Sequence, residues 1–256
     1  MSKLPLRKIR VLGYELINEP PQTIAAAVCD DIGRGDPRSY FFLNPHSVVQ
    51  AAGDARLQEC FLDQDAELLC DGVGLSLANR LLNRQPVHRV WGQDFFLAVS
   101  RELSHRRQGR VYFLGGHADA LESLLSKYRN EFPGITATSG ETPPFKPEFS
   151  SADVAAMAER INAFHPDVLW VGVGSPKQEK LLRALQPLCH ISCAAAIGAV
   201  FDFYGGRVSL GPEWVQRSGL LWAYRLVMEP RRLWRRTLIS APLFVLRVLR
   251  EAVRQS

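Results

Sequence analysis

Hydrophobic residues gather in short runs that alternate along the chain with longer stretches of helical periodicity. The short runs, which predict strands, span 39–43, 66–70, 109–114, 135–138, 167–171 and 190–197. Apolar residues recur at helical spacing over 47–58, 75–82, 118–132 and 151–164. This alternation predicts the α/β class, with a Rossmann-like, mostly parallel sheet and helices on both faces.

Polar residues and glycines come directly after most of the predicted strands. They are Asn44, Asp71, Gly115, Gly116, Gly172, Gly174 and Gly198. In open parallel sheets, ligands bind outside the carboxyl ends of the strands. We therefore expect these residues to lie along one edge of the sheet and to form a ligand site there.

Charge is distributed unevenly along the chain. Residues 207–256 hold ten arginines and three acidic residues, a formal charge of +7, so the total of +5 leaves −2 for residues 1–206. The change in composition predicts a catalytic domain over 1–206 and a basic, arginine-rich helical appendage over 207–256. Such an appendage is expected to meet an anionic partner.

The apolar run 237–246 in this appendage fits two interpretations. It is shorter than the roughly 20 residues of a membrane span, so it predicts either a helix lying in the membrane interface or a core-packing helix with a solvated basic face. The charge asymmetry favours the membrane. We expect a cytoplasmic protein bound peripherally to the inner face of the cell membrane, because the N-terminus lacks the pattern of a signal peptide. The five cysteines show no CxxC spacing, which indicates thiols in a reducing compartment.

Asp71 is the first candidate for chemistry. It ends a predicted strand and precedes Gly72 and Gly74, which would let the backbone approach a ligand closely and then begin a helix. A carboxylate at that point could take a proton from a sugar hydroxyl. It could equally cap the helix, as Asp often does, and the spacing alone does not decide between the two.

The stretch 171–179 predicts a strand-to-helix turn, with Ser175 as the helix N-cap and Pro176 at the first helical position. The N–H groups of such a helix N-terminus can bind an anion, although the third glycine of a dinucleotide fingerprint is missing. Arg89 could bind a phosphate bidentately, or it could form a structural ion pair with Asp94. The stretch 198–206, which contains Asp202, carries aromatic residues that could stack on a base or pack in the core.

A metal site is not expected. Asp63 and Asp65 match the Asp-x-Asp metal motif of many glycosyltransferases, but they lie in a helix-to-strand connection away from the ligand edge, which favours a solvated face. The six histidines show no metal-ligand spacing. We predict neither a cofactor nor a required metal.

In their order and spacing, these motifs together resemble the WecG/TagA/CpsF family of bacterial glycosyltransferases (glycosyltransferase family 26). The matching stretches are 44–49, 71–74, 89–94, 172–179 and 198–203, and 222–236 is similar to the family's C-terminal segment. The resemblance implies an inverting transferase that moves a sugar from a UDP-sugar to a polyprenyl-pyrophosphate-linked saccharide in surface or exopolysaccharide biosynthesis.

The resemblance also assigns roles to individual residues. It implies that Asp71 is the catalytic base. The residues expected to bind substrate are Asn44, Arg89, Gly172, Gly174, Gln178 and Asp202. Arginines of the C-terminal segment, best matched by Arg225, Arg232 and Arg235, are expected to close over the pyrophosphate and to help hold the enzyme at the membrane.

The donor sugar stays open at this stage. Pro45 and His46 depart from the small or hydroxylated residues expected in the wall-teichoic branch of the family. UDP-glucose, UDP-N-acetylmannosamine and its uronic acid are therefore all candidates. In the implied displacement, arginines and helix N–H groups would stabilise the leaving diphosphate in place of a metal.

Two rival functions follow from the same sequence. A dinucleotide-dependent oxidoreductase would need a complete fingerprint with an acidic residue further on, and the sequence has none. A non-catalytic, membrane-associated nucleotide-binding or scaffold protein would explain the basic tail. It would not explain why Asp71, Arg89 and Gln178 are expected to cluster. No nucleic-acid partner is expected, and apolar residues on the tail helix would also suit a homo-oligomer contact.

Overall fold

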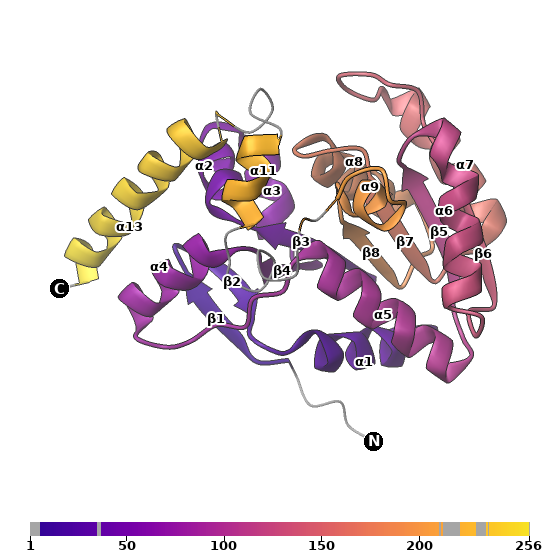
Figure 1. The fold of residues 1–256 in the computed structure, drawn as a ribbon, viewed down its shortest axis with the longest axis horizontal. Coiled ribbons are helices and arrows are strands. Elements are labelled where there is room, and N and C mark those ends of the chain that lie inside the picture. The colour runs from indigo at the N-terminus through magenta and orange to yellow at the C-terminus, as the bar shows by residue number, and fades with distance from the viewer. Residues whose placement is uncertain are drawn as a thin grey trace.

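The computed structural model describes residues 6–34, 37–209, 211, 221–228, 234 and 236–255. Within them lies one eight-stranded sheet with the strand order β1-β2-β4-β3-β8-β7-β5-β6 (Figure 1). The strands are β1 (Lys8–Val11), β2 (Tyr14–Ile17), β3 (Arg38–Leu43), β4 (Ala66–Cys70), β5 (Arg110–Gly115), β6 (Ala137–Glu141), β7 (Val168–Gly172) and β8 (Cys193–Ala196). Strand β1 pairs antiparallel with β2, and the other pairs of neighbours are parallel. The mostly parallel sheet is confirmed.

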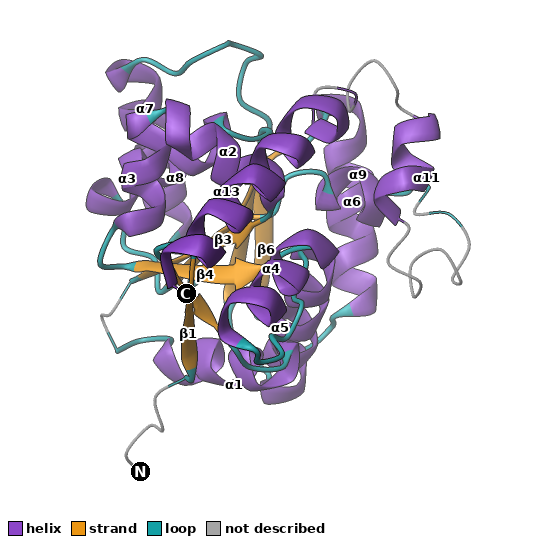
Figure 2. Ribbon diagram, turned by 90° about the vertical axis from the view of Figure 1, so that its left-hand side faces the viewer, coloured by secondary structure: helices purple, strands orange, loops and turns teal. Residues whose placement is uncertain are grey.

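Helices cover both faces of the sheet (Figures 1 and 2). One face carries α2 (Pro45–Gly53), α3 (Ala55–Leu62), α4 (Val73–Asn83), α7 (Ser151–Phe164) and α8 (Lys177–Leu185), which is followed by the short 3₁₀ helix η1 (Gln186–Leu188). The other face carries α1 (Pro21–Asp31), α5 (Gly92–Arg106), α6 (Ala118–Glu131) and α9 (Val200–Tyr204).

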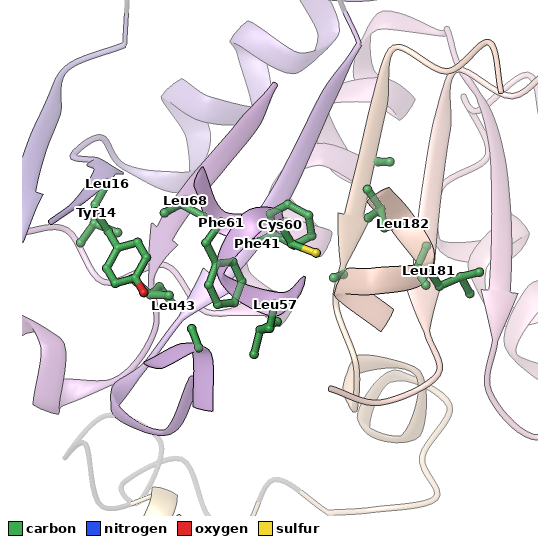
Figure 3. Close-up of a cluster of buried hydrophobic side chains, with 14 of the residues drawn as sticks. Tyr14, Leu16, Phe41, Leu43, Leu57, Cys60, Phe61, Leu68, Leu181 and Leu182 are labelled. Atoms are coloured by element: carbon green, nitrogen blue, oxygen red, sulfur yellow. The ribbon is translucent and has the colours of Figure 1, made fainter. Parts of the chain in front are cut away.

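Each layer of helices buries its own hydrophobic cluster against the sheet. On the first face, Phe41 of β3, Leu57 of α3 and Leu181 of α8 belong to one buried cluster (Figure 3), in which the ring of Phe41 meets the ring of Phe61 edge-on with centroids 5.8 Å apart. On the other face, the ring of Phe95 from α5 meets the ring of Trp170 from β7 edge-on, with centroids 5.9 Å apart. Because both faces are buried, the central strands are apolar on both sides, and this explains their uninterrupted hydrophobic runs.

The expected convergence of strand ends is confirmed by the register of the sheet. Leu43 pairs with Cys70, Gly115 pairs with Gly172, and Val171 pairs with Ala196. The residues that follow β3, β4, β5, β7 and β8 therefore lie along one edge. Neighbouring strands β3 and β8 join the two halves of that edge.

Several predicted boundaries differ from the structure, and the reasons for three of them can be seen in it. The single helix expected over 47–58 is two helices, because Asp54 is extended (φ −136°, ψ 95°) and its side chain caps α3 by accepting a hydrogen bond from the Leu57 N–H. Helix α8 begins one residue late, with Pro176 rather than Ser175 at the N-cap. Edge strand β6 starts after Thr136, since the turn from α6 is still closing there through the Ile135 N–H to Phe132 carbonyl bond.

The C-terminal part of the chain comprises α11 (Leu221–Met228), the π-helix η2 (Arg236–Ser240) and α13 (Ala241–Gln255). Of these, η2 packs on α2. Helix α13 lies against α2 and α4, where Phe244 and Val248 are buried (Figure 1). In the described residues, none of the helices has both the length and the apolar composition needed to traverse a bilayer. The division at residue 206 stays a prediction.

Candidate active site

Asn44 and Asp71 meet at the carboxyl ends of β3 and β4. The Asn44 side-chain nitrogen donates a hydrogen bond to Asp71 Oδ2 over 3.2 Å. The Asn44 oxygen is already engaged, because it accepts the backbone N–H groups of His46 and Ser47 as the N-cap of α2. Ser47 completes a capping box with the Asn44 backbone. The cap therefore fixes which end of the Asn44 amide faces the carboxylate.

Arg89 and Asp94 lie beside this pair. The backbone of Arg89 bridges to Cys70, next to Asp71, and the Arg89 side chain is exposed. Burial raises the pKa of Asp94; the Asp71 charge adds to that increase, whereas hydrogen bonds from Trp91 and the charge of Arg89 oppose it. Among the described residues no ion pair joins Arg89 to Asp94, so the Arg89 guanidinium faces solvent at the site.

The two glycines after Asp71 have different surroundings, open space at Gly72 and a close neighbour at Gly74. Gly72 has φ +83°, a left-handed value that side chains rarely adopt, and it is the N-cap of α4. A Cβ on Gly74 would lie 2.5 Å from Cγ of Pro45, so Gly74 lets α4 pack closely against the start of α2. The close approach expected for a ligand at Gly74 is thus taken by Pro45.

Pro45 and His46, the pair that departs from the wall-teichoic branch, both contact other parts of the protein. Pro45 packs on Gly74, and His46 Nδ1 is 2.8 Å from the hydroxyl of Ser240 in η2. The guanidinium of Arg247 from α13 donates a hydrogen bond to the carbonyl of Val48 in α2 over 3.3 Å. The N-terminal half of α2, whose N-cap is Asn44, therefore contacts the C-terminal segment through two hydrogen bonds.

Gln178 forms a second polar centre at the carboxyl end of β8. Its side chain is 5% exposed, and its nitrogen donates to the Ala196 carbonyl and to Glu179 Oε1, each over 3.1 Å. The carbonyl can only accept, so the amide nitrogen must face it. The Gln178 oxygen has no partner among the described atoms, and it lies where a Cβ on Gly198 would be 3.2 Å away.

Gly172, Gly174 and Asp202 lie along the same half of the edge. A Cβ on Gly172 would come within 2.9 Å of the Phe201 ring, so this glycine is required by packing. Gly174 has φ +86° with open space around its Cα. The Asp202 carboxylate lies 3.8 Å from the imidazole of His117 at the start of α6. Phe201 is buried, as the core-packing alternative predicted.

The remaining expected residues lie elsewhere. Arg225 belongs to α11 but its side chain is outside the described residues, as are Arg232 and Arg235 altogether. Asp63 and Asp65 face away from the ligand edge, where Arg183 and Gln186 of the α8 region bind them. No three His, Cys, Asp or Glu side chains of the described chain gather as metal ligands would.

Glu179 was missed by the sequence analysis. It is buried at the start of α8, and burial raises the pKa of its carboxyl to about 7, against the opposing effect of hydrogen bonds from its own N–H, Gln178 and Ser175. Charged residues at helix starts are usually solvated, so the sequence signal was only its position in the first turn. The sequence also gave no sign that Asp94 is partly buried.

Comparisons with known proteins identify the family of this chain. The model of the Glycosyl transferase WecG/TagA/CpsF family matches residues 9–256. An N-acetylglucosaminyldiphosphoundecaprenol N-acetyl-β-D-mannosaminyltransferase of Bacillus subtilis is 30% identical over 184 residues, which is 72% of this chain and 68% of the relative. Proteins of the same name from Bacillus spizizenii and Staphylococcus aureus are 28% and 21% identical over 81% and 94% of this chain, and over 77% and 92% of their own.

Proposed function

The chain belongs to the WecG/TagA/CpsF family and is a glycosyltransferase, and on that premise we propose that it moves a sugar from a UDP-sugar to a saccharide linked to polyprenyl diphosphate. The observation that carries the site assignment is the Asn44–Asp71 hydrogen bond. It joins the two polar residues that follow neighbouring strands, at the edge where parallel sheets bind ligands.

In the proposed reaction, Asp71 is the general base. Its carboxylate takes the proton from an acceptor hydroxyl, and the oxygen then bonds to the anomeric carbon of the donor. The bond from that carbon to UDP breaks on the opposite side, the electron pair leaves with the diphosphate, and the configuration is inverted. Asn44 donates to the Asp71 oxygen that does not take the proton, which keeps the other oxygen directed at the acceptor.

The leaving diphosphate needs positive partners, and we assign these to arginines instead of a metal. Arg89 is exposed beside Asp71 and free of ion pairs in the described part of the chain. Arg225, Arg232 and Arg235 are assigned by the family resemblance, together with the N–H groups that follow Gly172 and Gly174. Asp202 and Gln178 are assigned to the nucleotide-sugar.

N-acetylmannosamine is the donor sugar we propose first. The three relatives described above are named for the transfer of N-acetylmannosamine to an N-acetylglucosaminyl-diphosphoundecaprenol. The departure at Pro45 and His46 no longer argues against this sugar, because those side chains contact Gly74 and Ser240. UDP-glucose and UDP-N-acetylmannosaminuronic acid are the comparison donors.

We also propose that the segment 207–256 is an appendage that holds the enzyme peripherally at the inner face of the membrane. One stripe of α13 exposes Leu246, Leu249 and Val253, with exposed fractions of 44%, 52% and 77%. Arg250 and Arg254 are exposed on the same helix. An apolar stripe with neighbouring arginines suits an anionic lipid surface.

Asp71→Asn tests the proposed function. We expect turnover with UDP-N-acetylmannosamine and a synthetic lipid-diphosphate acceptor to fall about 10³-fold or more, since a general base contributes roughly 10² to 10⁴ in rate. UDP should still bind to this variant.

Asp65→Asn, at the opposite edge of the sheet, is the matched control and should keep wild-type turnover. The wild-type enzyme should also keep its turnover in the presence of a chelator. Near wild-type turnover of Asp71→Asn would refute the base; vesicle binding without transfer from any of the three donors would favour the scaffold alternative.

A further inference from the structure

The Gln178 side chain depends on Glu179 for its orientation. Of the two acceptors of the Gln178 amide nitrogen, the Ala196 carbonyl belongs to the sheet and the other is Glu179 Oε1, each 3.1 Å away. With both N–H groups used, only the amide oxygen has no partner among the described atoms, and this oxygen is buried beside Gly198. Removing Glu179 would leave a buried N–H without an acceptor, and such a group rotates or recruits water to recover a partner.

The Glu179 carboxyl belongs to the first turn of α8. The N-cap of that helix is Pro176, which offers no capping side chain. Glu179 stands three residues later, where hydrogen bonding from its own N–H and from Ser175 partly opposes the effect of burial on its pKa. It is 6% exposed, and its Oε2 has no partner among the described atoms.

We propose that Glu179 is a positioning residue of the active site: its carboxylate holds the Gln178 amide so that the amide oxygen accepts a hydrogen bond from the bound sugar nucleotide. The inference rests on the proposed function only for the identity of the ligand. A carboxylate is a stronger acceptor than a neutral carboxyl group, so the hold on Gln178 is firm when Glu179 is ionised and weaker when it is protonated.

The surroundings of Glu179 let it change charge near neutral pH. Burial raises its pKa to about 7, and the charge of Lys180 is a minor opposing effect because Lys180 is paired with Asp54 over 2.6 Å. From α3, which packs against α8, the facing titratable group is the Cys60 thiol; burial raises the pKa of Cys60 to about 11, so it stays neutral. Strands β7 and β8 present buried apolar residues there, Val171 and Ala196.

Two substitutions of Glu179 distinguish a role in orienting the Gln178 amide from a role in the stability of the fold alone. Glu179→Gln keeps an acceptor oxygen but cannot ionise, whereas Glu179→Leu fills similar space without an acceptor. In the wild type we expect the donor KM to rise about tenfold as the pH falls through about 7, the size of one lost charge-assisted hydrogen bond. The kcat should change less. Glu179→Gln should have a KM that is flat over this range, and Glu179→Leu a KM raised about tenfold or more at every pH.

Hydrogen exchange of the Gln178 carboxamide provides a readout without any ligand. In protein labelled with ¹⁵N-glutamine, its signals are identified as those missing from Gln178→Leu. Exchange should stay slow in the wild type and in Glu179→Gln, and become at least about tenfold faster in Glu179→Leu. Glu67→Gln, a carboxylate of β4 paired with Lys8, is the control and should keep both the wild-type KM and slow exchange.

Unchanged exchange in Glu179→Leu would overturn the proposal, whether or not the enzyme transfers sugar. Normal transfer by the wild type with the same KM profile in Glu179→Gln would overturn it as well, and would leave the proposed function intact. If the wild type transfers no sugar while exchange responds as expected, the proposed function fails and the positioning of Gln178 by Glu179 stands.

Discussion

The side-chain amide of Asn44 caps helix α2 with its oxygen and binds the Asp71 carboxylate with its nitrogen, 3.2 Å away. One residue thus couples the start of a helix to the orientation of the proposed base. Two hydrogen bonds, one between His46 and Ser240 and one from Arg247 to the Val48 carbonyl, join helix α2 to the C-terminal segment. The C-terminal segment is therefore connected to the Asp71 carboxylate through the first residues of α2 and their N-cap, Asn44.

Asn44→Ala should reduce both stability and turnover. Loss of the cap costs about 1 kcal/mol of unfolding free energy, which chemical denaturation would measure. Loss of the hydrogen bond to Asp71 frees the carboxylate to rotate, and we expect kcat to fall about tenfold or more.

Asn44→Asp distinguishes these two effects. It keeps a capping oxygen, so its unfolding free energy should stay close to that of the wild type. It also places a second carboxylate against Asp71, and the repulsion favours a shared proton. The acidic limb of the pH–rate profile should then move to higher pH. An unshifted profile with full activity would mean that the Asn44 nitrogen has no part in setting the base.

Gly74→Ala should destabilise the protein through overpacking. The new Cβ would lie 2.5 Å from Pro45 Cγ, so α4 or α2 must move, at a cost of about 1 to 3 kcal/mol. Gly53→Ala, where nothing lies within 4 Å, is the control and should be neutral or slightly stabilising. Equal denaturation midpoints for the two variants would show that α4 and α2 can move apart to accommodate the new Cβ without a loss of stability.

Glu179 should make stability depend on pH. Its pKa is raised from 4.5 to about 7 in the folded protein, so the folded state binds the proton more tightly. This contribution is fully present below pH 4.5 and is lost as pH rises through about 7. The unfolding free energy of Glu179→Gln relative to the wild type should therefore increase with pH by about 3 kcal/mol. Parallel stability curves for the two proteins would contradict a buried, titrating carboxyl.

Leu249→Glu should weaken membrane binding. Leu249 is 52% exposed on α13, and burying a leucine in lipid is worth about 2 kcal/mol, so the partition coefficient onto anionic vesicles should fall at least tenfold. Leu62→Glu changes a leucine that is 57% exposed on α3 and is the matched control. Co-sedimentation with phosphatidylglycerol vesicles measures both. Equal loss in the two variants would place the membrane contact elsewhere or reduce it to charge alone.

The sequence by itself determined the class of fold and the sheet edge at which the candidate site residues lie. Both follow from local information: apolar runs, helical periodicity and the glycines that end strands. The same pattern missed the β1–β2 hairpin, in which Leu12 and Gly13 form a left-handed turn between short strands. It also merged α2 with α3, because the break at Asp54 depends on a cap and on Lys180 from α8.

Only the tertiary structure decided how the site residues act on one another. Asp71 and Asn44 are 27 residues apart in the chain, and their contact requires β3 and β4 to pair in register. Glu179 reads as an ordinary charged residue, yet the packing of α8 against α3 removes it from water and moves its pKa to about 7. Local patterns fix what each segment can become, whereas burial and hydrogen bonding across the fold set the charge and direction of the groups that carry out chemistry.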